Sequence, residues 1–219
     1  MSAAIIMEDV AHGIVEGGRR KATLAPLSRR FDAGEFHVVK GPSGAGKTTL
    51  LSILSLTVRP ERGMISFGDD NLTRLRAPQQ AAWRRANLAL VFQTSRLVSI
   101  LTVKEHIRLA ASIRNRPSAL EEGLAILGQL GLHDKLGSLP TALSGGEKQR
   151  VAIAQSLCFG PSVLLADEPT AALDQANAAL VAAVLRNYAH SSGAVVICVS
   201  HDRAVIDVAD RLLELEKAQ

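Results

Sequence analysis

The first candidate site is a glycine-rich run that ends in a lysine and two hydroxyls: Gly41, Pro42, Ser43, Gly44, Ala45, Gly46, Lys47, Thr48 and Thr49. This spacing fits the phosphate-loop pattern, in which glycines let successive backbone N–H groups turn toward phosphate oxygens at the start of a helix. In that pattern the lysine reaches the β- and γ-phosphates, and the hydroxyl after it can ligate Mg²⁺. We therefore expect Lys47 and Thr48 to bind a nucleoside triphosphate and its metal ion.

A pair of carboxylates follows a short apolar run. The residues 163–166 are all apolar, and Asp167 and Glu168 come directly after them. If this run is a buried parallel strand, Asp167 lies at the carboxyl edge of the sheet, where α/β proteins bind their ligands. There Asp167 can hold Mg²⁺ through water, and Glu168 is suited to orient and deprotonate an attacking water. By itself such an ending often caps a helix, but beside a phosphate loop it indicates nucleotide hydrolysis.

A third motif stands at the start of a helical pattern: Ser144, Gly145, Gly146 and Glu147. Ser144 and Glu147 have the spacing of a capping box, in which each side chain accepts a hydrogen bond from the other residue's backbone N–H. A capped helix start with two glycines is also a ready anion site. From the residues alone, an ordinary capped helix explains the motif equally well.

The elements that must position these motifs alternate between short β-rich runs and longer helical patterns. Predicted strands are 36–40, 88–92, 163–167 and 194–200, and predicted helices begin near Lys47 and cover 102–114, 119–130, 146–157, 175–188 and 203–208. A second capping box, Thr102 with Glu105, marks the start of the helix at 102. The alternation predicts βαβ units around a parallel sheet. The segment 94–157 is nearly all helical and is expected to be a subdomain inserted between two core strands.

The composition is typical of a globular α/β protein. Hydrophobic residues make up 47% of the 219 residues but aromatic residues only 3%, so the core must consist mainly of alanine, leucine, isoleucine and valine. The length predicts a single domain, residues 1–219. The formal net charge of +4 is small and scattered, and a cluster such as 19–21 is more typical of a solvated face than of a nucleic-acid interface. We therefore expect no nucleic-acid partner.

Nothing in the sequence predicts export or a membrane span. No apolar run approaches the roughly 18 residues that cross a bilayer. The N-terminal segment contains Glu8 and Asp9 and lacks the basic start of a signal peptide. Cys158 and Cys198 lie in apolar runs, which predicts small buried side chains and fits a reducing compartment. We expect a cytoplasmic protein, whose membrane part, if it has one, is supplied by a partner.

The run Leu143-Ser144-Gly145-Gly146-Glu147-Lys148-Gln149-Arg150 resembles the signature motif of the ABC ATPases. Further family markers follow in family order: Gln93 resembles the Q-loop glutamine, Leu173-Asp174 the D-loop, and His201 the switch histidine. The resemblance covers essentially the whole chain. It implies an α/β fold with a P-loop NTPase core and parallel sheet, an N-terminal antiparallel β subdomain and an inserted α-helical subdomain.

The resemblance also implies a head-to-tail dimer, either of two copies of this chain or of this chain with a similar ATPase. Each ATP would lie between residues 41–49 of one subunit and Ser144, Gly145, Gly146 and Glu147 of the other. Thr48, Asp167 and Gln93 would bind Mg²⁺, with Gln93 also near the attacking water. Glu168 would be the catalytic base, His201 would contact the γ-phosphate, and Asp174 would communicate across the dimer.

A transmembrane permease is the second implied partner. The insert 94–157 would receive its coupling helix, which would place this chain peripherally on the cytoplasmic face of the plasma membrane. The run 166–174 is most similar to the ATPases of lipoprotein-releasing, macrolide-export and glycolipid-export systems. Few residues follow His201, so the regulatory domain of many sugar importers is not expected.

The sequence departs from the family pattern at two positions. Ile14 stands where an aromatic residue usually stacks on adenine, with His12 as the only nearby ring. Because aromatic stacking on a base contributes roughly 1–3 kcal/mol, this predicts weak discrimination between ATP and GTP. Gln155 stands where an arginine is common, and no consequence follows from that change.

Two other readings of the sequence remain open. One is a soluble ABC protein that acts on nucleic acid, although such chains usually carry two cassettes or a long coiled coil. The other is a cassette that regulates a membrane complex without moving a substrate. A kinase or GTPase with a phosphate loop is disfavoured, because neither needs the motif at 144–147.

Overall fold

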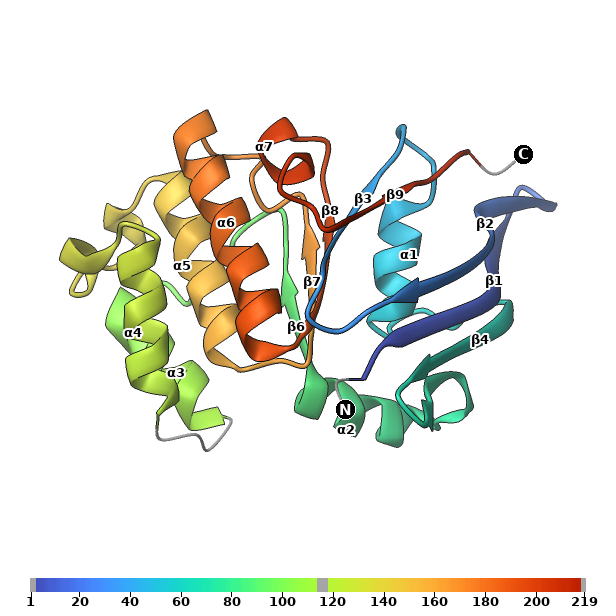
Figure 1. Ribbon diagram of the computed structural model, residues 1–219, viewed down its shortest axis with the longest axis horizontal. Coiled ribbons are helices and arrows are strands. Elements are labelled where there is room, and N and C mark those ends of the chain that lie inside the picture. The colour runs from blue at the N-terminus through green and yellow to red at the C-terminus, as the bar shows by residue number, and fades with distance from the viewer. Residues whose placement is uncertain (1–2, 114–117, 218–219) are drawn as a thin grey trace.

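The structure is a computed structural model that describes residues 3–113 and 118–217 of the chain. Figure 1 shows a larger and a smaller sheet with a helix between them, and a group of helices against the far face of the larger sheet. The larger sheet has five parallel strands in the order β6-β7-β8-β3-β9. Its strands are β6 (Leu88–Val91), β7 (Val163–Asp167), β8 (Val195–Val199), β3 (Phe36–Lys40) and β9 (Arg211–Glu214).

The central strands of this sheet are apolar because both of their faces are covered. Every residue of β8 is buried, and so are the first four residues of β7. The single polar residue of these two strands is Asp167, which is the last residue of β7 and stands at the carboxyl edge of the sheet. The predicted parallel sheet and the predicted position of Asp167 are therefore confirmed.

The smaller sheet is antiparallel, with strand order β2-β1-β4-β5. It consists of β1 (Ile5–Glu16), β2 (Arg19–Phe31), β4 (Arg62–Phe67) and β5 (Asp70–Asn71). A two-residue turn, Gly17-Gly18, joins β1 to β2 with φ values of 59° and 76°. Turns with two positive φ values match the twist of a hairpin and favour glycine. The antiparallel subdomain that the family resemblance implied is present.

Helix α1 (Lys47–Leu54) lies between the two sheets (Figure 1). Its apolar residues Leu50, Ile53 and Leu54 are fully or almost fully buried and belong to one cluster with residues of β1, β3 and β7. Helix α2 (Ala77–Asn87) leads directly into β6 and buries Trp83 against the same cluster. Because α1 follows the phosphate loop, this packing fixes the loop against both sheets.

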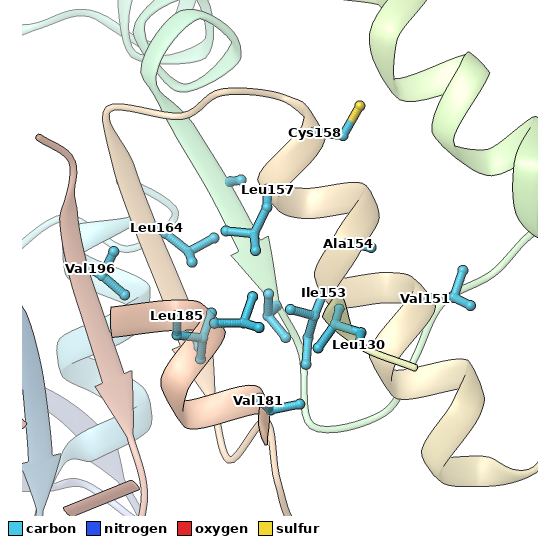
Figure 2. Close-up of a cluster of buried hydrophobic side chains, with 14 of the residues drawn as sticks. Leu130, Val151, Ile153, Ala154, Leu157, Cys158, Leu164, Val181, Leu185 and Val196 are labelled. Carbon is cyan, nitrogen blue, oxygen red and sulfur yellow. The ribbon is translucent and has the colours of Figure 1, made fainter. Parts of the chain in front are cut away.

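The other face of the parallel sheet is covered by helices that are clearest on the left of Figure 1. They are α3 (Val103–Ile113), α4 (Ala119–Gln129), α5 (Gly145–Cys158), α6 (Gln175–Ser192) and the short α7 (Arg203–Ile206). Figure 2 shows that α5 and α6 share a core with the sheet, in which Leu157, Leu185 and Leu164 meet. Helices α3 and α4 pack on the outer side of α5.

The predicted elements differ from the structure mainly at their ends. Strands end within one residue of the predicted positions, while the helix predicted at 175–188 continues to Ser192 and the one at 203–208 ends at Ile206. The longer helix stops only where Gly193 adopts a left-handed conformation with φ 70°, which glycine tolerates best. Residue 114, the predicted end of the helix at 102, lies outside the described residues. Helix α2 was not predicted.

Both cysteines are buried, as expected, and the Cys158 thiol donates to the carbonyl oxygen of Ala119 at 3.1 Å. The capping box at Thr102 and Glu105 is also confirmed: the Thr102 N–H donates to Glu105 Oε2 at 2.7 Å, and the Glu105 N–H donates to Thr102 Oγ1 at 3.3 Å. In the described part of the chain, no helix is both long and apolar enough to cross a membrane.

Candidate functional site

The phosphate loop connects β3 to α1, and glycines at two of its positions allow close approach of the backbone. A Cβ atom on Gly46 would lie 2.4 Å from the carbonyl oxygen of Thr23, and one on Gly41 would lie 2.5 Å from that of Leu215. Gly46 also has φ 91°, and it is the N-cap residue directly before α1. The loop therefore packs tightly enough on β2 and on the segment after β9 that only glycine fits.

Lys47 is positioned within this loop by its own hydrogen bonds. Its Nζ donates to the carbonyl oxygens of Gly41 at 2.7 Å and of Pro42 at 3.1 Å. The ammonium group thus lies across the loop whose N–H groups would bind phosphate. A cation and the N-terminus of α1 together make the loop favourable for an anion.

A pocket of about 340 Å³ lies between the phosphate loop and the β1–β2 hairpin. Its lining includes most of the loop, namely Ser43, Gly44, Gly46, Lys47, Thr48 and Thr49. On the hairpin side it is lined by Ile14, Lys21, Ala22 and Thr23. A larger hollow of about 610 Å³ lies beside Gly160 and Tyr188 but contains none of the motif residues. The smaller pocket is the candidate site because the phosphate loop forms one wall of it.

The two residues considered for contact with the base are placed differently. Ile14 lines the pocket and is 44% exposed, so its side chain is available to a ligand. His12 is not among the described residues that line the pocket, and its Nδ1 lies 2.7 Å from Thr23 Oγ1. The histidine therefore positions Thr23, which itself lines the pocket.

Glu168 lies at the carboxyl ends of the two central strands and has an unusual backbone conformation. Its φ is 44°, and its N–H donates to the carbonyl oxygen of Val199, the last residue of β8, at 2.9 Å. Its Oε1 lies 2.9 Å from Nδ1 of His201, which follows β8. A left-handed non-glycine residue held by a neighbouring strand is typical of functional sites. The structure brings Glu168 and His201 together as a hydrogen-bonded pair.

Asp167 carries an altered pKa. Partial burial and the neighbouring charge of Glu168 raise the pKa of the Asp167 carboxyl, while the charge of Lys47 opposes this shift. The edge of the sheet therefore concentrates negative charge opposite the lysine of the phosphate loop. A carboxylate, the Thr48 hydroxyl and the amide oxygen of Gln93 are oxygen ligands of the kind that Mg²⁺ prefers. The residues present thus fit a magnesium site chemically.

The motif at 144–147 starts α5 as a capping box. The Ser144 N–H donates to Glu147 Oε2 at 2.7 Å, and the Glu147 N–H donates to Ser144 Oγ at 3.2 Å. Ser144 and Gly145 are exposed. No described residue of this motif lines the pocket beside the phosphate loop. Within one chain the two candidate anion-binding motifs consequently do not share a pocket.

The remaining candidate residues lie near this helix start. Gln93 is exposed just after β6, and the carbonyl oxygen of the preceding Phe92 accepts a hydrogen bond from Gln149 Nε2 of α5 at 2.8 Å. Asp174 caps α6 by accepting from the Asn177 N–H at 2.8 Å. The side chain of Asn177 also contacts Arg150 of α5. These contacts join the Q-loop and D-loop residues to the helix that Ser144 starts.

Sequence reasoning did not single out Lys21, Ala22 and Thr23 as residues of the pocket. The signal that could have found them is the two-glycine turn at 17–18. That turn fixes the register of the hairpin, in which Ile14 pairs directly with Lys21. Paired residues of a hairpin place their side chains on the same face.

Comparisons with known proteins agree with this geometry. Residues 24–171 match a family model described as ABC transporter. Over 217 residues the chain is 36% identical to the macrolide export ATP-binding/permease protein MacB of Brucella melitensis, with 98% of this chain and 33% of that protein covered. Over 216 residues it is 35% identical to the putative hemin import ATP-binding protein HrtA of Staphylococcus aureus, with 97% of each covered. The chain therefore spans a third of MacB and nearly all of HrtA.

Solved structures show the same likeness. A dimeric structure of MJ0796, a bacterial ABC transporter cassette, is 29% identical and superposes with a TM-score of 0.86 over 97% of this chain and 94% of that one. A dimeric post-hydrolysis state of MJ0796 bound to ADP and Pi is 28% identical, with a TM-score of 0.84 over 98% and 97% of the two chains. The chain belongs to the ABC transporter family, as one of its ATP-binding and ATP-hydrolysing cassettes.

Proposed function

We propose that this chain works as one of two cassettes that bind and hydrolyse ATP between them, and that the pair drives a separate transmembrane permease. The observation that carries the proposal is that the phosphate loop and the motif at 144–147 do not share a pocket within one chain. A second cassette, turned head to tail, can bring its exposed Ser144 and Gly145 to the phosphate loop of the first. The dimeric form of the related MJ0796 cassette supports this arrangement.

The site residues then have distinct roles in hydrolysis. The backbone N–H groups of the phosphate loop and the Lys47 ammonium would hold the phosphates, and Thr48, Asp167 and Gln93 would hold Mg²⁺. The metal ion, when bound, neutralises charge on the phosphates. Glu168 accepts a proton from the attacking water, and His201 positions the Glu168 carboxylate through the 2.9 Å hydrogen bond while it contacts the γ-phosphate. Asp174 contacts the partner cassette.

The permease would dock on the helical insert, residues 94–157. Val98, Ile100, Leu109 and Ile113 are apolar side chains in this segment with exposed fractions of 46%, 79%, 39% and 57%. A pocket of about 410 Å³ extends this surface, because Ile113 lines it together with residues of α2 and β6. Leu109 and Ile113 are four positions apart on α3 and so share one face of that helix, and exposed apolar patches mark interaction sites. We place the whole chain, as a single ATPase domain, on the cytoplasmic face of the plasma membrane in this assembly.

An export or extraction system is the transport class that we propose. The relative in Brucella melitensis supports it, since the name of that protein joins an ATP-binding part to a permease for macrolide export. The relative in Staphylococcus aureus is named for import, so the names of the two relatives differ in the direction of transport.

The test is co-purification of the tagged chain from membranes of its own host. We expect an integral membrane protein to co-purify with the wild type and to be lost from the Leu109→Asp and Ile113→Asp variants. Leu212→Asp is the matched control, because Leu212 is 43% exposed on β9, outside the insert. All variants should keep ATPase activity as isolated proteins. Recovery of nucleic acid without a membrane protein would contradict the proposal. A membrane partner that transports nothing in reconstituted vesicles would make the cassette a regulator.

A further inference from the structure

The pocket beside the phosphate loop contains a second cation that the proposed mechanism does not use. Of the ten described residues that line it, Lys47 and Lys21 are basic and none is acidic. Lys47 belongs to the phosphate loop, while Lys21 lies on β2, on the opposite wall. The two lysines therefore approach the pocket from different elements of the fold.

The position of Lys21 follows from the register of the hairpin. Ile14 and Lys21 are directly paired residues of β1 and β2, so their side chains project from the same face. Both line the pocket. A nucleotide whose phosphates are held by the loop extends away from the loop, and the hairpin wall is the other side of the same pocket. Ile14 and Lys21 thus form the surface that its base meets.

The chemistry of this surface discriminates between purines. Ile14 offers only an apolar contact, which every base accepts equally. A lysine ammonium has three donors and no acceptor, so contact with a base does not require it to give up other partners. Guanine presents two acceptors along one edge, N7 and O6, and lysine commonly donates to them. Adenine presents N7 beside the N6 amino group, a donor that cannot accept from lysine.

We propose that Lys21 is a specificity-determining residue of the nucleotide site, which donates to the N7 and O6 edge of guanine and so raises the affinity of this ATP-binding site for GTP relative to ATP. This inference rests on the proposed nucleotide site and adds a residue that contacts the base of the bound nucleotide. It assigns the role of base recognition to the cation on β2, on a wall of the pocket that Ile14 also lines.

The test is calorimetric titration of ATP, GTP and inosine triphosphate, each with Mg²⁺, on the wild type and on Lys21→Met. Inosine carries O6 and N7 but lacks the 2-amino group of guanine, so it should bind like GTP. Because a hydrogen bond from a charged donor at an exposed position is only partly effective, we expect Lys21→Met to weaken GTP and inosine triphosphate by roughly three- to tenfold more than ATP. Lys104→Met is the control, since it removes the same charge from an exposed position on α3.

A measurement on the wild type alone gives an independent check. The 7-deaza analogue of GTP lacks the N7 acceptor and should bind more weakly than GTP. An equal loss of all three nucleotides in Lys21→Met would overturn the inference, because it would show a contact with phosphate instead of the base. Unchanged affinities in Lys21→Met, or equal binding of GTP and its 7-deaza analogue, would also overturn it. Failure of the wild type to bind any of the nucleotides would instead refute the proposed nucleotide site.

Discussion

Glu168 combines a strained backbone with a fixed side chain. Its left-handed φ of 44° is held by the hydrogen bond from its N–H to Val199, and its carboxylate is held by His201. Left-handed backbone is costly for residues other than glycine and persists only where surrounding contacts determine it. The carboxylate is consequently positioned before any ligand binds, as a catalytic base requires.

The substitution Glu168→Gln tests this assignment. It keeps the size of the side chain but removes the group that accepts a proton, so hydrolysis should fall by roughly 10²–10⁴-fold. Binding of ATP should survive, and the variant should accumulate as an ATP-bound dimer, measured by phosphate release and by size-exclusion chromatography. Glu121→Gln, an exposed change on α4, is the control. A Glu168→Gln protein with nearly the wild-type rate would show that another group is the base.

A buried histidine makes stability depend on pH. His37 is only 2% exposed, its Nε2 lies 3.0 Å from the carbonyl oxygen of Asp32, and burial lowers the pKa of its ring despite the nearby carboxylate of Glu35. The folded protein therefore keeps His37 neutral, whereas the unfolded chain takes up a proton as the pH falls below about 6.5. The stability that neutral His37 contributes is present above that pH and is lost below it.

We accordingly expect the free energy of unfolding to fall between pH 7.5 and 5.5, with a slope from this residue of at most about 1.4 kcal/mol per pH unit. His37→Gln keeps a donor for the Asp32 carbonyl but does not titrate, so its slope should be shallower. His133→Gln, at an exposed position, should leave the slope unchanged. Urea unfolding at several pH values measures all three. Parallel curves for the wild type and His37→Gln would contradict the assignment.

At the scale of elements, glycine positions on α4 show how closely the inserted helices pack. A Cβ atom on Gly123 would lie 2.4 Å from Ile107 Cγ2 of α3 and 3.0 Å from Cys158 Sγ of α5. One on Gly128 of the same helix would meet nothing within 4 Å. Gly123 is thus the point where three helices come together, while Gly128 faces solvent.

These two glycines should respond to alanine with opposite signs. Overpacking costs roughly 1–3 kcal/mol, more than the gain of up to about 1 kcal/mol in helix propensity, so Gly123→Ala should lower the melting temperature by several degrees. Gly128→Ala should raise it, because only the propensity gain applies. Differential scanning calorimetry of both variants checks the signs. If both variants are stabilised, α3 and α5 are free to move apart.

The sequence predicted the parallel core well because its strands carry a strong local signal. β7 and β8 are short apolar runs. The phosphate loop, Asp167 and His201 stand at the carboxyl ends of predicted strands. Because these strands run parallel, their carboxyl ends meet at the same edge of the sheet. The antiparallel sheet was expected only from the family resemblance. Its strand β5 has two residues, and β1 pairs through register shifts, so neither shows a clear alternation.

Local patterns also could not show which residues meet in the pocket. Lys21 lies 26 positions before Lys47 in the chain, and only the hairpin register and the packing of the loop on β2 bring both to one cavity. The contact of Gln149 with the carbonyl oxygen of Phe92 likewise joins residues that are distant in sequence. Such contacts depend on tertiary packing, which a single sequence does not reveal.

At the scale of the whole molecule, the proposed dimer makes a prediction about mixed subunits. Lys47→Ala removes the lysine that is proposed to bind the phosphates, and Ser144→Arg blocks the exposed start of α5 with a bulky side chain. Each variant alone should be inactive. In an equal mixture, half of the dimers contain one subunit of each variant, and each of these mixed dimers keeps one of its two sites intact. If the sites act independently, the mixture should therefore recover up to about a quarter of the wild-type rate of hydrolysis. Phosphate release from the mixture measures this.

The control for the mixing experiment is Lys47→Ala combined with a second variant of the same loop, such as Thr48→Val. That pair damages the same motif in both subunits and should show no recovery. Normal hydrolysis by Ser144→Arg alone would rule out a role for the motif at 144–147. Full inactivity of the first mixture, with dimers shown to form, would mean that the two sites must work together.

Each edge strand of the parallel sheet has a backbone acceptor that is occupied by a side chain. On β6 the carbonyl oxygen of Leu90 accepts from Ser156 Oγ at 3.3 Å, and just beyond the strand that of Phe92 accepts from Gln149. On β9 the carbonyl oxygen of Leu212 accepts from Arg29 Nη2 at 3.5 Å. Open strand edges recruit strands from other molecules and lead to aggregation. Because these acceptors are already occupied, a strand from another copy of the cassette finds fewer groups to pair with at the two edges of this sheet.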